Sequence, residues 1–285
     1  MGHVAFYMGE FRLCEEFNSA AAMSASLPPA LRGYALVRRG NALWFLGFPD
    51  QALALTKEGS RLVEDADDPY QYCLMLLYAV VTHLLCRKLA EAEDLCRKAL
   101  NTSTERGFPV VGATTTLFMG LVTVERGQAL AGLEQLHRGI ELRSASPAFG
   151  QQPEPHGFWL AEGLASVGRL DEAFAALVPD LQRMEQSGVE QDLAHMYELR
   201  GRLFVGKSNP NEAENSFRTA IEIARRQSAK SLELNATTSL ARFLAEQGRR
   251  DEARAMLAEI YNWFTEGFDT ADLKEAKALL EELSN

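Results

Sequence analysis

Two arginines at matching positions offer the most recognisable chemistry in this sequence. Arg202 and Arg242 lie 40 residues apart. A guanidinium group donates parallel hydrogen bonds to a carboxylate, so two such groups facing one groove would bind an acidic ligand. Solvated or salt-bridged arginines on helix surfaces explain the same pattern. The sequence leaves both interpretations open.

Aromatic and polar residues extend this candidate groove. Trp44 and Phe45 would anchor a bound peptide, or they would pack between neighbouring helices, which is the favoured interpretation. The full set of residues expected to face the groove is Tyr34, Asn41, Trp44, Phe45, Phe158, Glu162, Arg202 and Arg242.

Motifs of catalysis and metal binding are missing from the sequence. It has no Walker A motif, no GxGxxG after a strand, no HExxH and no GxSxG. The histidines have no i,i+4 pair, and the four cysteines have no CxxC pair. We therefore expect no enzyme activity, no cofactor and no metal, and we expect the cysteines to be buried, reduced thiols in a cytoplasmic protein.

Charge and hydropathy exclude two classes of partner. The net charge is −10, whereas nucleic-acid binding needs a clustered basic surface. The longest apolar run, residues 73–86, has 14 residues and is too short to span a bilayer. We expect neither a nucleic-acid nor a membrane partner.

A repeat of about forty residues runs through the whole chain and must position these side chains. A first mark, small in every unit except at Val80, is separated by gaps of 38, 40, 40, 41, 40 and 40 residues, and a second mark follows twelve residues after each. The first marks are Gly2, Gly40, Val80, Gly120, Ala161, Gly201 and Ala241, and the second are Cys14, Ala52, Ala92, Gly132, Ala173, Ala213 and Ala253. Such a period predicts a solenoid whose units stack to bury a common core.

Each unit is expected to form two helices joined by a tight turn. A glycine after the last apolar residue ends the first helix in most units, at Gly9, Gly47, Gly127, Gly168 and Gly248. The third unit has Arg87 in place of this glycine. The side chains expected to cap the second helices are Asp50, Asp171, Asn211 and Asp251.

The two ends of the array differ. Gly2 already occupies the middle of a first helix, so we interpret the chain as the C-terminal piece of a longer polypeptide. The predicted single solenoid comprises a partial repeat at 1–26, six hairpins at 27–260, and an aromatic cluster with a capping helix at 261–285. The cluster either covers the open end of the stack or docks a partner, through Tyr261, Trp263, Phe264 and Phe268.

The segment 40–52 resembles the tetratricopeptide (TPR) repeat. It follows the pattern small-x-x-aromatic/Leu-x-x-x-Gly-x-x-x-x-Ala, which recurs at 161–173 and 241–253. The usual TPR period is about 34 residues, so longer helices are expected here. The resemblance implies an all-α, right-handed solenoid of about seven hairpins.

The segments 224–234 and 260–280 resemble the C-termini of large bacterial signalling proteins. Those proteins carry an adenylate/guanylate cyclase or winged-helix DNA-binding domain, a STAND-type ATPase module and a TPR array. The resemblance implies a protein-interaction or sensor region that binds a protein or peptide on its concave face, including the upstream domains of the same polypeptide. The alternatives are a small-molecule effector domain of an ATPase-type transcriptional regulator and a stand-alone TPR adaptor.

Overall fold

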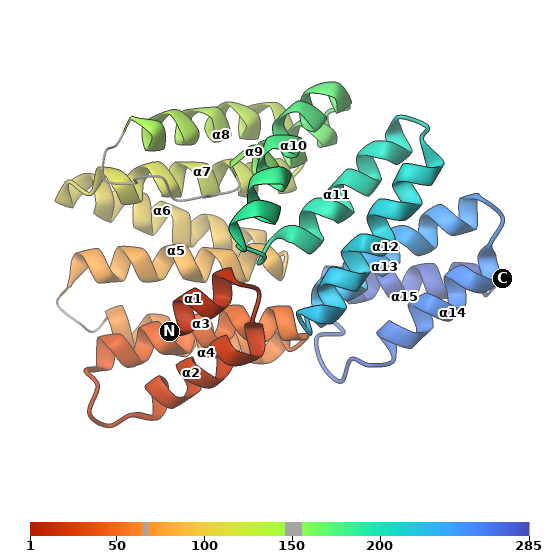
Figure 1. Ribbon diagram of the computed structural model, residues 1–285. Helices are drawn as coiled ribbons and strands as arrows, with labels where there is room; N and C mark the ends of the chain where they lie inside the picture. Colours follow the sequence, from red (N-terminus) through yellow and green to blue (C-terminus); the bar gives the residue numbers. More distant parts are fainter. Residues whose placement is uncertain (65–67, 146–155, 285) are drawn as a thin grey trace.

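The computed structural model describes residues 1–64, 68–145 and 156–284, and every regular element in these ranges is an α-helix (Figure 1). Consecutive helices pair into seven antiparallel hairpins, and a single helix follows them. The first helices of the hairpins are α1 (Gly2–Tyr7), α3 (Pro29–Leu46), α5 (Pro69–Leu85), α7 (Pro109–Glu125), α9 (His156–Ser166), α11 (Leu193–Gly206) and α13 (Lys230–Glu246). The second helices are α2 (Phe11–Met23), α4 (Pro49–Glu64), α6 (Leu89–Arg106), α8 (Ala129–Ser144), α10 (Leu170–Ser187), α12 (Pro210–Arg226) and α14 (Arg250–Tyr261), and α15 (Ala271–Leu283) ends the array. The predicted all-α, TPR-like solenoid is confirmed.

Small residues set the distance between the two helices of a hairpin. A Cβ atom added to Gly40 would lie 2.8 Å from the carbonyl oxygen of Ala52, and one added to Gly132 would lie 2.8 Å from that of Gly120. Real Cβ atoms essentially never approach other atoms below 3.0 Å. The backbones therefore meet where the repeat places its two small residues.

A residue in the turn after each of the first helices adopts the left-handed backbone conformation, as the glycines in the sequence predict. Gly47 has φ of 95° and Gly127 has φ of 81°. Arg87 adopts φ of 52° at the equivalent turn without a glycine, and Ser208 adopts φ of 55°. The turn is thus a property of the repeat, and glycine only lowers its strain.

The prediction that acidic side chains cap the second helices is wrong. Asp50, Asp171 and Asp251 lie inside the first helical turn, where a negative charge complements the helix dipole but does not cap the helix. Asn211 also lies inside its helix, and the capping side chain is Asn209, which accepts a hydrogen bond from the Glu212 N–H at 3.5 Å.

The solenoid completes one turn, so that its late hairpins touch its early ones (Figure 1). Helix α13 packs against α3, and the Ser231 hydroxyl donates to the carbonyl oxygen of Trp44 at 2.5 Å. The Trp263 ring lies 5.7 Å from the Phe48 ring, centroid to centroid. We call this contact the seam: Trp44 and residues 47–51 on one side, and Lys230, Ser231 and residues 263–267 on the other.

A second contact closes the ring near the N-terminus. The Glu190 N–H, between α10 and α11, donates to the carbonyl oxygen of Tyr7 at 2.8 Å. Gln227 Nε2 donates in turn to the Glu190 carbonyl oxygen at 2.7 Å. The first hairpin is therefore held by the fifth and sixth hairpins as well as by its neighbour in sequence.

The predicted burial of the cysteines is confirmed, because Cys14, Cys73, Cys86 and Cys96 are all buried, and they are free. None of the helices in the described ranges has the length and apolar character that a membrane crossing requires.

Candidate functional site

Closure of the ring surrounds a central cavity of about 900 Å³ that stays open to solvent. The first helix of every hairpin contributes to its wall, and α15 adds Asp272 and Glu275. The stack of parallel first helices thus forms a continuous inner surface. This cavity is the candidate functional site.

One wall is aromatic and tightly packed. Phe45 stacks on Phe11 with ring centroids 4.1 Å apart, and it meets Phe6 edge-on at 5.4 Å. Trp44 meets Phe45 edge-on at 5.1 Å. Trp44 and Phe45 are only 2% and 3% exposed, so they pack between helices and present no more than an edge to the cavity.

Another part of the wall, on α9 and α11, carries an ionic network centred on Arg202. Its NH2 group lies 2.6 and 2.8 Å from the two carboxylate oxygens of Glu162, and its Nε lies 3.0 Å from Glu198. The Ser239 hydroxyl donates to Glu198 at 2.6 Å. Burial alone would lower the pKa of Arg202, but the two carboxylates outweigh it and raise that pKa. Arg202 is therefore fully ionised and already paired.

Arg242 and Arg87 extend this network toward α15. Arg242 pairs with Glu275 at 2.8 Å, and Arg87 contacts Glu125 at 2.7 Å and Asp272 at 3.4 Å. Burial raises the pKa of Asp272, an effect that Arg87 only partly offsets. Arg202 and Arg242 do face one cavity, yet each is salt-bridged within the chain.

Six of the eight residues expected in the groove line this cavity: Trp44, Phe45, Phe158, Glu162, Arg202 and Arg242. The other two lie elsewhere. Asn41 is wholly buried between α3 and α5, where it donates to the Tyr78 carbonyl at 3.0 Å and to the Thr82 hydroxyl at 2.7 Å. Tyr34 is half-buried and meets Tyr78 edge-on at 5.7 Å.

Sequence reasoning missed a second register of lining residues. They stand two positions before the small residue of a first helix, and they are Arg38, Tyr78, Phe118, Trp159 and Ser239. This signal is present in the sequence, since the same offset recurs in five units. The prediction relied on the position one residue after the small residue. In the second unit this position is Asn41, which is buried against α5.

The C-terminal aromatic residues are divided between contacts within the chain and solvent. Phe264 is 5% exposed in the core beside α14 and α15, and Trp263 packs on the seam, where Lys230 Nζ lies 5.5 Å from its ring centroid. Tyr261 and Phe268 contact each other at 6.1 Å, and Phe268 is 48% exposed. A docking role for these residues stays a prediction.

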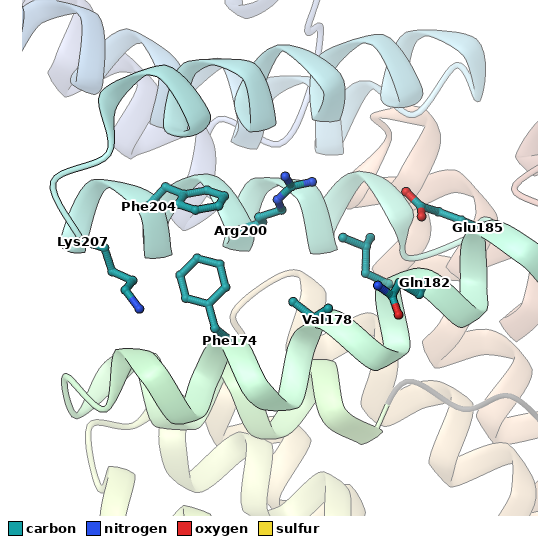
Figure 2. A pocket seen from close by; sticks show the side chains of 8 residues that line it. Phe174, Val178, Gln182, Glu185, Arg200, Phe204 and Lys207 are labelled. Atoms are coloured by element: carbon teal, nitrogen blue, oxygen red, sulfur yellow. The ribbon is translucent and has the colours of Figure 1, made fainter.

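A smaller groove of about 410 Å³ lies between α10 and α11, away from the central cavity (Figure 2). Phe174 on α10 faces Phe204 on α11 with ring centroids 4.8 Å apart. Its two cations are already paired, Arg200 with Glu212 at 3.3 Å and Lys207 with Asp171. The groove is less than half the size of the cavity and presents fewer polar groups.

Metal chemistry finds no support in the described ranges, where no group of three or more potential ligands occurs. His3 and His195 line the cavity, but they are two single residues on α1 and α11. The arrangement can hold a ligand by hydrogen bonds, ion pairs and aromatic contacts.

Comparison with known proteins gives a fold and no family. No family model matches the chain, and no curated protein matches it. A Rap protein complexed with competence and sporulation factor superposes with a TM-score of 0.68 at 15% identity, covering 99% of this chain and 77% of the other. The Rap conjugation regulator of plasmid pLS20, in complex with the Phr* peptide, gives 0.67 at 11% identity, covering 99% and 72%.

A signal-transduction ATPase also shares the fold. The STAND protein with a tetratricopeptide repeat sensor from Pyrococcus horikoshii superposes with a TM-score of 0.53 at 13% identity. The match covers 89% of this chain and 38% of the ATPase. The likeness shows a helical repeat architecture common to TPR and Rap proteins.

Proposed function

We propose that this chain is a non-catalytic binding domain that holds a peptide or a short protein segment in the central cavity. The observation that carries the proposal is an open central cavity of about 900 Å³ to whose wall all seven hairpins contribute side chains. This volume lies in the upper part of the range of roughly 300–1,000 Å³ typical of ligand sites. The lining combines aromatic edges with amide, carboxylate and guanidinium groups, which suit the alternating backbone and side chains of a peptide.

A structure of the same fold supports the choice of a peptide. The pLS20 regulator is described in complex with a peptide, and the match covers 99% of this chain. At 11% identity the likeness speaks for the architecture and leaves the ligand's sequence open.

The larger context we propose is the sensor arm of a bacterial signalling ATPase joined to a cyclase or winged-helix domain. The resemblance of segments 224–234 and 260–280 supports it, as does a STAND ATPase whose sensor is a TPR array. A ligand would change ATPase activity only if it binds one state of the whole protein more tightly than the other. Sequencing the gene upstream of Met1 tests this context, and a stop codon in frame with a native start site contradicts it.

The binding proposal is tested by affinity selection from a random peptide library against residues 1–285. The blocked variant is Ala165→Phe, which adds a ring to a cavity-lining position on α9. The matched control is Ala175→Phe, the same change at an exposed position on α10 of the same hairpin. We expect selected peptides to bind Ala165→Phe at least about tenfold more weakly and Ala175→Phe unchanged. Equal binding to both variants would place the peptide outside the cavity.

The cavity's size also admits a small-molecule effector, which is the second candidate. Thermal shift against a panel of metabolites, with the same two variants, separates the candidates. A metabolite that stabilises the wild type and the Ala175→Phe control but not Ala165→Phe, with no peptide selected, would favour the effector.

A further inference from the structure

Arg38 differs from the paired arginines of the central cavity. It lies on α3 and is 3% exposed, and its NH1 group donates to Asn41 Oδ1 at 3.2 Å. Its Nε and NH2 groups are buried with no hydrogen-bond partner. Across the parts of the chain that the structure describes, no carboxylate lies within salt-bridge distance of Arg38, whereas Arg202 and Arg242 both have one.

Two aromatic rings flank the Arg38 guanidinium. Its central carbon lies 4.3 Å from the Phe6 ring centroid and 4.6 Å from the Tyr78 centroid. Cation–π attraction offsets part of the cost of burying the charge. The rings contact the guanidinium and make no hydrogen bonds with the N–H groups in its plane. They fix the orientation of the group and leave its edge without a hydrogen-bond partner.

An unpaired buried guanidinium is unfavourable and cannot relieve itself by losing its proton. His3, which lines the same end of the cavity, adds no charge at neutral pH, because burial and then the charge of Arg38 lower its pKa to about 4. The site thus presents one positive charge and two free parallel donors. A singly charged anion with two oxygens complements both features.

The chain already contains this pairing elsewhere. At Arg249, Nε and NH2 donate to the two carboxylate oxygens of Glu252 at 2.8 and 2.9 Å. The same two nitrogen atoms are the free ones on Arg38. We propose that Arg38 binds a carboxylate group of the ligand in the central cavity, through the Nε and NH2 edge of its guanidinium.

The carboxylate comes from a peptide C-terminus, an acidic side chain or a free organic acid. That the ligand is a peptide rests on the proposed function, whereas the carboxylate site rests on Arg38 alone. The two donors are shielded from water in this structure. We therefore expect His3 and Tyr7, which line the cavity on the short helix α1, to move as the carboxylate enters.

The first test is an NMR titration of residues 1–285 with sodium acetate and with N-acetylglycine, observing the arginine Nε–H resonances. We expect the Arg38 resonance to move downfield and to saturate in the millimolar range, with sodium chloride and acetamide causing no such shift. No movement with either acid overturns the proposal. A response to inorganic phosphate alone overturns the assignment to carboxylate.

Three variants separate a ligand site from a structural cation. Arg38→Met should abolish acetate binding and keep or raise the melting temperature, since it removes an unpaired buried charge. Arg38→Lys keeps the charge but loses the two-pronged edge, so acetate should bind about tenfold more weakly. The control Arg39→Met, on the adjacent residue that pairs with Glu15 at 2.7 Å, should bind acetate normally. A lower melting temperature for Arg38→Met, with wild-type protein indifferent to acetate, would make Arg38 purely structural.

Matched peptides identify the source of the carboxylate. Each peptide selected from the library is remade with an amidated C-terminus and, separately, with its acidic side chains amidated. Loss of affinity on C-terminal amidation assigns the C-terminus, and loss on side-chain amidation assigns an acidic residue. If acetate binds Arg38 and no peptide binds, the carboxylate site stands and the peptide function fails. Peptide binding that is equal in wild-type and Arg38→Met protein leaves the function standing and overturns the carboxylate site.

Discussion

The backbone N–H of Asp50 donates a hydrogen bond to the carboxylate of Glu266, 216 residues further along the chain. Glu266 Oε1 accepts from the backbone N–H groups of Asp50 at 2.9 Å and Gln51 at 3.1 Å. The Asp50 carboxylate accepts from the backbone N–H of Gly267 at 2.9 Å. Glu266 thus caps helix α4 from the far end of the array, and the acid expected to cap α4 serves the other side of the seam.

Removing this cap should weaken the fold measurably. We expect Glu266→Ala to lower the free energy of unfolding by about 1 kcal/mol, because two N–H groups at a helix N-terminus lose a charged acceptor. Urea unfolding measures the change. Glu259→Ala, at an exposed position of α14, is the control and should be nearly neutral. Equal effects of the two changes would mean that this cap contributes no stability.

Gly47→Ala should destabilise more than Gly127→Ala. Both glycines have positive φ, so both substitutions cost about 1–2 kcal/mol in backbone strain. A Cβ at Gly47 would also lie 2.6 Å from the Trp263 ring, whereas one at Gly127 would meet nothing within 4 Å. Thermal unfolding of the two variants isolates the contribution of seam packing, and identical melting temperatures would contradict it.

Arg202 should matter more for stability than Arg242. Arg202→Met leaves Glu162 and the buried Glu198 without their cation, and we expect a loss of about 1–2 kcal/mol, since the arginine is itself partly exposed. Arg242→Met breaks one exposed pair and should cost less than about 0.5 kcal/mol. Chemical unfolding at neutral pH compares them. Equal losses of unfolding free energy in the two variants would contradict a central ionic network.

Asp272 should make stability fall as pH rises. Burial raises its pKa in the folded protein despite Arg87, so the folded state binds this proton more tightly than the unfolded state. The ionised carboxylate is therefore destabilising above its folded pKa, and the penalty vanishes below the pKa of an unfolded aspartate. We expect Asp272→Asn to gain stability over wild type as the pH rises above the pKa of an unfolded aspartate, about 3.9.

The control for this pH dependence is Asp251→Asn, at an exposed position in the first turn of α14. Urea unfolding at several pH values follows both variants. A gain that is independent of pH for Asp272→Asn would show that the substitution acts through packing.

The four thiols should resist modification in the folded protein. All are buried, and burial raises the pKa of each thiol, to about 12 for Cys86 and Cys96. Because the thiolate is the reactive form, we expect slow labelling by Ellman's reagent in buffer and rapid labelling of all four in denaturant. Fast labelling of a single cysteine in buffer would reveal local opening of its hairpin.

Features confined to one repeat were predictable because their cause is local. Gly120 and Gly132 are twelve residues apart, and the close approach of their helices needs no information from another unit. The left-handed turns follow in the same way. The hairpins and their order were therefore available from the sequence.

Features that join different repeats were not available, because they depend on how small rotations per unit accumulate around the ring. Arg202 and Arg242 share a position in the repeat and reach the same cavity, but the pairing of Arg242 with Glu275 requires the placement of α15. Asn41 shares that position as well and is turned into the contact with α5. The meeting of Asp50 with Glu266 follows only when the whole turn is complete.

The seam also limits how this array can change in length. In an open solenoid, loss or duplication of one unit shortens or lengthens the stack and leaves the remaining interfaces intact. Here, a change of one forty-residue unit would carry Glu266 past the start of α4 and set Trp263 against a different surface. The ring therefore closes only when the number of hairpins matches the rotation between successive hairpins. The same number sets the width of the central cavity.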